Sequence, residues 1–161
     1  MPATLPVPIE FSLPEGWVPA PAPEDVAYAA VRPQPDGGFA VNITVDGGFP
    51  KEDVTPADLA DASVERLRSF AEEVAVTRRS ELGTPDSPAL AQRITFSAAV
   101  GDSLRDFVQS QVYLFLLDTE DPGKRALVRL ALTSTVAQEG GVLEDFRAFV
   151  RSVRPVTGEG V

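Results

Sequence analysis

The chain has no cysteine and no histidine among its 161 residues. The absence of cysteine excludes disulfides, thiolate nucleophiles and thiolate metal ligands. The absence of histidine removes a common metal ligand and the commonest general base near neutral pH. Catalysis would have to depend on carboxylates, lysine, tyrosine or serine, so no cofactor and no metal site is expected.

Basic residues are scarce relative to acidic ones, with 14 Lys and Arg against 24 Asp and Glu and a net charge of -10. A surface of this sign repels phosphate backbones and anionic lipids, so nucleic acid is not an expected partner.

Long apolar segments are absent too. The densest apolar run, "VYLFLL" at residues 112–117, is far shorter than the roughly 20 residues of a membrane helix. The opening "MPATLPVPIEF" has no basic region and three prolines, which is unlike a signal peptide. We therefore expect a cytoplasmic protein without membrane insertion. A length of 161 residues is typical of one domain, so we also expect a single domain over residues 1–161.

The N-terminal third is typical of short strands. "AYAAVRP" at residues 27–33 and "FAVNITV" at residues 39–45 flank the turn sequence "QPDGG", and apolar residues alternate with smaller or polar ones in the second segment. This period of two predicts a hairpin. Trp17, the single tryptophan, follows "LPEG" and is expected to fold over the core, because burying a large aromatic side chain stabilises a small domain.

The first predicted helix lies within residues 54–74. Thr55 is a suitable N-cap, Pro56 a suitable first helical residue, and Asp58 stands at the capping-box position. The expected apolar stripe of this helix consists of Leu59, Ser63, Leu67, Phe70 and Val74.

A second helix is predicted over residues 140–155, entered at the glycine pair Gly140 and Gly141 and stopped by Pro155. Its expected stripe consists of Val142, Phe146, Phe149, Val150 and Val153.

Four strand patterns separate the two helices, at about residues 74–81, 89–99, 106–118 and 125–135. The element order predicts an α+β fold, in which an antiparallel sheet of about six to seven strands packs with two main helices.

A polar sheet face is the candidate site. Even positions of the strands at 89–99, 106–118 and 125–135 are mainly apolar, whereas odd positions carry polar or amphipathic side chains. If like faces align, one side of the sheet is core and the other is an open polar surface. That surface is either ordinary solvated sheet or a binding groove. Its predicted binding residues are Arg93, Gln109, Gln111, Tyr113 and Arg129.

The opening "FSLPEGW", the helix near residue 55, the long middle strands and the closing "FRAFVRSVRP" resemble the PsbP/DcrB/LpqN-type α/β/α sandwich. That group includes a photosystem II subunit, actinobacterial lipoproteins, chaperones of secreted effectors and a Ran-binding import factor. The composition, low in Lys and rich in Ala, Val, Arg and Pro, is similar to actinobacterial members, although the cysteine of a lipoprotein anchor is missing.

The resemblance and the missing catalytic chemistry together predict a non-enzymatic adaptor or chaperone-like domain that binds a protein or peptide. Two alternatives stay open, which are a small-molecule-binding protein that uses the polar sheet face and a carboxylate-based hydrolase. The sequence defines neither the partner nor an oligomeric state.

Overall fold

The computed structural model describes residues 9–23, 26–33, 39–51, 53–84, 87–117 and 125–155. Its centre is a seven-stranded sheet in which all neighbouring strands are antiparallel. The strand order is β2 (Val18–Ala20), β3 (Tyr28–Val31), β4 (Asn42–Gly48), β8 (Arg125–Thr135), β7 (Ser103–Leu117), β6 (Pro88–Val100) and β5 (Glu72–Gly83). A separate short pair joins β1 (Ile9–Glu10) to β9 (Arg154–Pro155).

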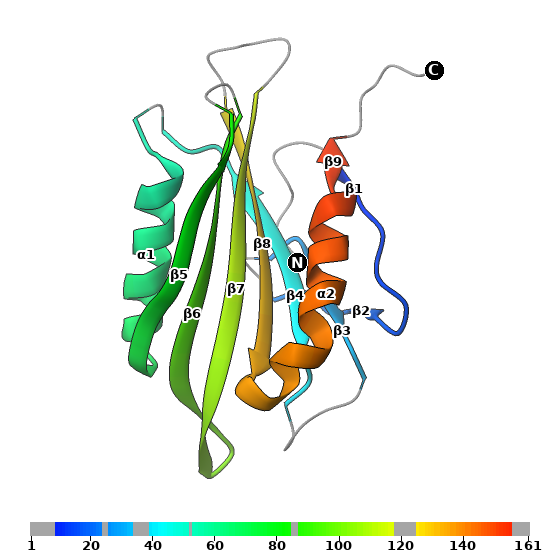
Figure 1. Ribbon diagram of the computed structural model, residues 1–161, viewed down its shortest axis with the longest axis vertical. Helices are drawn as coiled ribbons and strands as arrows, with labels where there is room; N and C mark the ends of the chain where they lie inside the picture. Colours follow the sequence, from blue (N-terminus) through cyan, green and yellow to red (C-terminus); the bar gives the residue numbers. More distant parts are fainter. Residues whose placement is uncertain are drawn as a thin grey trace.

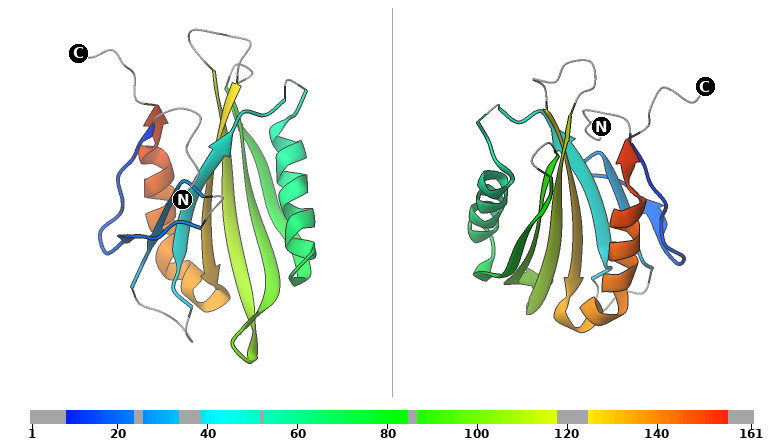
Figure 2. Two further views of the ribbon diagram at one scale, coloured as in Figure 1. Left: turned by 180° about the vertical axis from the view of Figure 1, so that it is seen from behind. Right: turned by 45° about the horizontal axis from the view of Figure 1, so that its top comes forward.

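Two helices cover opposite faces of the sheet (Figures 1 and 2). The helix α1 (Pro56–Arg68) packs on β5, β6 and β7, whereas α2 (Val136–Ser152) packs on β7 and β8 from the other side. The fold is therefore an α+β sandwich, as the element order predicted. Each helix covers only part of its face, and this determines where the surface is hollowed.

The main core lies between the sheet and α2. Alternate residues of β4 and β8, including Ile43 and Leu130, point into it and are fully buried. Phe146 and Phe149 of α2 pack on them, as expected from the apolar stripe of that helix. Trp17 closes this core and is 6% exposed, and its Nε1 donates to Asp145 Oδ2 at 3.0 Å. The prediction that Trp17 has a structural position is confirmed.

The first helix begins where the sequence predicts and ends earlier. Thr55 and Asp58 form the expected capping box, with N to O distances of 3.0 and 3.1 Å. The helix stops at Arg68, so Phe70 lies beyond it with 67% of its surface exposed, and Val74 belongs to β5. Placing both on the helical stripe is therefore wrong. The β-branched residues after position 73 favour an extended chain, and this chain pairs with β6 through backbone hydrogen bonds.

The second helix begins four residues earlier than predicted. Thr135 is its N-cap and Gln138 completes a capping box, so Gly140 and Gly141 lie inside the helix and not at its entry. The helix forms despite the low helix propensity of glycine, because the apolar face of α2 packs on the sheet.

The predicted hairpin of the N-terminal third is formed by β3 and β4. Val18–Ala20 adds a further strand to it. The turn sequences at residues 34–38 and 118–124 lie outside the described residues.

Candidate binding surfaces

The five polar residues predicted to form one open face do not share a face. Gln109, Gln111 and Tyr113 of β7 and Arg129 of β8 lie on the α1 side of the sheet, because their side chains bond to one another or line pockets beside α1. Arg93 points to the opposite side, where it meets α2. The prediction of a common open face is wrong.

The strand register explains the error. In the β6–β7 ladder, Gln92 pairs with Gln111 and Ile94 with Gln109, so even positions of β6 share a face with odd positions of β7. Helices cover both faces of the sheet, so apolar side chains occur on both faces of β6 and β7. The alternation of polar and apolar residues along each strand therefore does not determine the register between the strands.

Gln111 and Tyr113 are sealed beneath α1, each with 1% of its surface exposed. Gln111 Nε2 donates to Ser63 Oγ of α1 at 2.8 Å, and Gln111 Oε1 accepts from Gln92 Nε2 at 2.7 Å and from the Tyr113 hydroxyl at 2.9 Å. Gln92 in turn donates to the carbonyl of Ala60 at 3.2 Å. This buried amide network attaches α1 to the sheet.

Beside α1, the strands β4 and β8 remain partly uncovered and form a hollow of about 400 Å³ that we call the α1 cleft. Tyr113 and Arg129 contribute to its lining, and Arg129 continues into an adjoining hollow of about 210 Å³ together with Gln109. The exposed ring of Phe49 lines the α1 cleft, and the exposed ring of Phe70 lines the adjoining hollow. The α1 cleft and the adjoining hollow together thus contain three of the five predicted residues.

The charge inside the α1 cleft is paired. Arg129 Nε donates to Asp46 Oδ1 at 3.0 Å, and a second bond joins its Nη2 to Oδ2. Burial by itself would lower the pKa of Arg129, but the Asp46 carboxylate and the Tyr113 hydroxyl outweigh it and raise the pKa. The cleft therefore offers no net charge from this pair.

A second hollow, the α2 groove, lies on the other face between α2 and the strands β5 and β6, with a volume of about 400 Å³. Its strand side combines small, apolar, basic and amide residues, and its helix side combines part of the apolar stripe of α2 with charged residues. The strand residues are Arg78, Ser80, Leu82, Ala91, Gln92, Arg93, Ser110, Gln111 and Val112, and the helix residues are Glu139, Leu143, Phe146, Arg147, Val150 and Arg151.

Arg93 and Glu139 join the sheet to the first turn of α2. Arg93 Nε and Nη2 donate to the two carboxylate oxygens of Glu139 at 2.8 and 2.7 Å. This hydrogen bonding raises the pKa of Arg93 and lowers the pKa of Glu139, so both groups stay charged at neutral pH. The pair neutralises its own charge.

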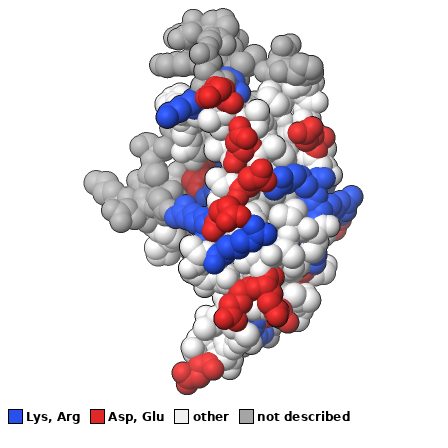
Figure 3. Space-filling view, turned by 90° about the vertical axis from the view of Figure 1, so that its left-hand side faces the viewer, with Lys and Arg blue, Asp and Glu red and all other residues white. Residues whose placement is uncertain are grey.

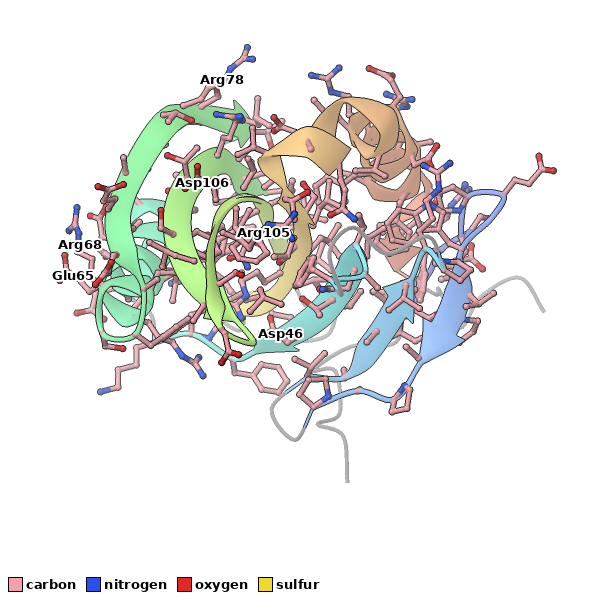
Figure 4. All side chains as sticks on the ribbon, turned by 90° about the horizontal axis from the view of Figure 1, so that it is seen from below. Asp46, Glu65, Arg68, Arg78, Arg105 and Asp106 are labelled. Carbon is pink, nitrogen blue, oxygen red and sulfur yellow. The ribbon has the colours of Figure 1, made fainter. Side chains whose placement is uncertain are left out.

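Two other arginines of the α2 groove have no such compensating partner among the described residues. Within the described part of the chain, neither Arg78 nor Arg151 has a side-chain hydrogen bond or ion pair. Arg147 bonds to Glu144 one turn earlier on the exposed side of α2. Figure 4 shows Arg78 extending from β5 away from the body of the protein. Basic charge therefore gathers around the groove in a chain whose net charge is -10.

The face formed by α1 and β5 has a different distribution. Figure 3 shows acidic and basic side chains interleaved there. Glu65 and Arg68 of α1, which lie side by side in Figure 4, form one such pair, and Arg79 of β5 bonds to Asp61 of α1 at 2.7 Å.

Sequence reasoning missed the α2 groove apart from Arg93 and Gln111, and the side chain of Gln111 bonds to Ser63 of α1. One signal was available, since Arg147 and Arg151 are spaced four residues apart beside the apolar stripe, which places them on one side of the helix. No signal connected them with Arg78, because their place around one groove depends on how α2 packs on the sheet.

The described ranges contain neither an acidic metal cluster nor a membrane-spanning helix. Over these residues, no group of three or more Asp or Glu is placed to hold a metal ion. No described helix has the length and apolar character needed to span a bilayer.

Comparisons with known proteins identify the fold. Neither a family model nor a curated protein sequence matches this chain. Among solved structures, LpqN of Mycobacterium tuberculosis, described as involved in cell envelope biogenesis, is 13% identical with a TM-score of 0.66, covering 93% of this chain and 86% of LpqN.

Two further structures have the same architecture. The Ran-binding protein Mog1 of Saccharomyces cerevisiae is 14% identical with a TM-score of 0.59, covering 92% of this chain and 90% of Mog1. The PsbP protein of Synechocystis sp. PCC 6803 is 15% identical with a TM-score of 0.57, covering 92% of this chain and 86% of that protein. By its seven-stranded sheet and two covering helices, this chain has the PsbP/LpqN/Mog1-like fold.

Proposed function

We propose that this protein is a non-enzymatic binding domain that accepts a segment of a partner protein in the α2 groove. The observation that carries the proposal is the composition of the groove, in which apolar side chains of β5, β7 and α2 are bordered by arginines. Leu82, at the β5 side, is 53% exposed. An apolar centre with an arginine-bearing rim is the usual anatomy of a protein interface.

The fold lends support to a protein partner. Mog1, which has this fold, is a Ran-binding protein. Fold likeness is an analogy, so the identity of the partner is not transferred to this chain.

The two alternatives have less support. A small-molecule site on the polar sheet face loses its surface, because α1 covers Gln111 and Tyr113. A carboxylate-based hydrolase needs a general acid with a raised pKa. Glu139, the carboxylate that lines the α2 groove, has a lowered pKa and is held in a two-bond ion pair with Arg93.

Site-specific photocrosslinking tests the proposal. A photoreactive phenylalanine analogue replaces Leu82 at the groove, and Leu104, which is 63% exposed on β7 and lies outside the α2 groove, serves as the matched control. In cells of the source organism, we expect discrete protein adducts from position 82 that are absent from position 104.

Filling the groove should abolish these adducts. Ala91, at the groove floor, is changed to Trp, and the exposed Ala148 of α2 is changed to Trp as a control. Loss of adducts with Ala91→Trp but not with Ala148→Trp supports the groove. Equal adducts from positions 82 and 104, or adducts that persist in a folded Ala91→Trp protein, would overturn the proposal.

A further inference from the structure

The α2 face of the sheet has room for one more helix beside α2. Strands are spaced about 4.8 Å apart and a helix is about 10 Å wide, so a helix covers about two strands. On this face α2 packs on β7 and β8, and no helix of the described residues covers β5 and β6. On the opposite face, α1 lies over β5, β6 and β7, so this half of the sheet already accepts a helix on its other side.

The floor and wall of the α2 groove have the shape that a packed helix requires. The floor includes the small side chains Ala91 and Ser110, which permit close approach. The wall includes Leu143 and Val150 of α2, which are seven residues apart on one ridge and only half-buried. Such a ridge fits the groove between the side-chain rows of a neighbouring helix. The apolar stripe of α2 therefore has a part that the sheet does not cover.

Arginines on both sides of the α2 groove indicate the charge of the segment that would bind there. Arg78 stands on the β5 side, and Arg147 and Arg151 stand on the α2 side. Arg78 and Arg151 have no side-chain hydrogen bond or ion pair among the described residues, and the exposed bond from Arg147 to Glu144 contributes little. Carboxylates on an incoming segment would meet cations along both of its sides.

Backbone pairing at the edge of the sheet is a poorer alternative. The free edge strand β5 carries Arg78, Arg79 and Glu81 in succession with Ser80, and its ladder with β6 has two register shifts. Glu73, near its start, has a φ of 53°. Charges and irregularities of this kind prevent an extended peptide from adding to an edge strand.

We infer that the α2 groove binds an acidic amphipathic helix of a partner protein, laid beside α2 over β5 and β6. This inference rests on the proposed function and adds the chemistry of the bound segment. The bound helix presents apolar residues at positions i, i+3 or i+4, and i+7 to the groove, with Asp or Glu on both sides of that stripe.

Designed helical peptides of about 18 residues, roughly five turns, are the probes. Four fluorescent peptides are compared by anisotropy with the full chain. Three share one apolar stripe and carry Glu, Gln or Lys beside it, and the fourth has the Glu composition in scrambled order. We expect the Glu peptide to bind at least about tenfold more tightly than the Lys peptide, the Gln peptide to be intermediate, the scrambled peptide not to bind, and added salt to weaken the Glu peptide most.

A charge-reversed pair of variants identifies the arginines involved. The double variant Arg78→Glu, Arg151→Glu should reverse the preference toward the Lys peptide. Its matched control, Lys51→Glu with Arg68→Glu, changes net charge equally at two exposed residues outside the α2 groove and should keep the preference for Glu.

The outcomes separate this inference from the proposed function. If the stripe peptides bind and Ala91→Trp abolishes binding, but Glu and Lys peptides bind equally or both double variants act alike, the acidic helix is wrong and the groove stands. If no stripe peptide binds, or the scrambled peptide binds as well, the inference is wrong and crosslinking at position 82 still decides the function. Peptide binding that survives Ala91→Trp would overturn both.

Discussion

At the scale of single residues, Tyr113 shows what determines the stability of the α1 layer. Its ring is buried with Ala60 and Leu90, and its hydroxyl donates to Gln111. We expect Tyr113→Ala to lower the free energy of unfolding by about 3–5 kcal/mol, the usual cost of removing a buried aromatic ring. Tyr113→Phe keeps the ring and should cost about 1 kcal/mol, because the hydroxyl's hydrogen bond to Gln111 is lost.

Chemical denaturation of both variants measures these differences. A loss below about 1 kcal/mol for Tyr113→Ala would show that α1 does not seal this position in solution. The Phe variant is the internal control, since it leaves the packing volume almost unchanged.

Glu139 links stability to pH. Its pKa is lowered in the folded protein by the hydrogen bonds from Arg93, so folding favours the ionised form. The contribution of this carboxylate is fully present above the ordinary glutamate pKa of about 4.3, and it is lost as the pH falls through the lowered value. We expect Glu139→Gln to reduce stability at neutral pH and to weaken the loss of stability on acidification.

Unfolding curves of the wild type and Glu139→Gln from neutral to acidic pH provide the measurement. The difference between the two proteins should shrink as the pH falls. A difference that stays constant at all pH values would mean that the ion pair with Arg93 does not form.

At the scale of elements, two glycines inside α2 reduce the stability of that helix. Gly140 and Gly141 lie within the helix, neither has a positive φ, and a methyl group added at either would meet no atom within 4 Å. We expect Gly140→Ala to raise the free energy of unfolding by about 0.5–1 kcal/mol, because alanine loses less backbone entropy on folding. Thermal or urea unfolding measures the gain.

Gly83 provides the contrasting substitution. Its φ is 81°, and an added Cβ would lie 2.3 Å from the carbonyl oxygen of Ser87. Gly83→Ala should therefore destabilise the protein, whereas Gly140→Ala stabilises it. If both changes had the same sign, the helical placement of Gly140 would be wrong.

At the scale of the whole molecule, the two helices overlap only partly when seen through the sheet. Both pack on β7, but α1 extends over β5 and β6 whereas α2 extends over β8. The α1 cleft and the α2 groove are the parts of the two faces that this arrangement leaves less covered. The molecule thus has the α1 cleft with a paired charge and the α2 groove, where Arg78 and Arg151 have no ion pair among the described residues.

Stability of the whole molecule is expected to be independent of metal ions. The apolar core is continuous from Trp17 to the aromatic residues of α2, and within the described ranges no acidic cluster could hold a metal. The melting temperature should be the same with and without EDTA. A clear decrease of the melting temperature in the chelator would reveal a metal site that these residues do not account for.

The cytoplasmic location expected from the sequence stays a prediction.

Local signals were sufficient to predict the class of fold. The capping box at Thr55, the apolar stripe around Phe146 and the period of two in Phe39–Val45 depend on neighbours close in the chain, so each element can be recognised without its partners. For the same reason, Trp17 could be placed in the core from its residue type. The boundaries were less certain, because the end of α1 depends on pairing between β5 and β6.

Tertiary structure alone decided the binding surfaces. The prediction that Arg93 lies beside Gln109 and Tyr113 required the register between β6 and β7, and a shift of one residue moves a whole strand's side chains to the other face. Likewise, Arg78 and Arg151 are 73 positions apart in the numbering and line the same groove only because α2 packs on β7 and β8, next to the uncovered strands β6 and β5. The sequence alone determined which elements form, because their causes are local. The packing of the helices decided which side chains remain accessible, because that depends on contacts between residues distant in the chain.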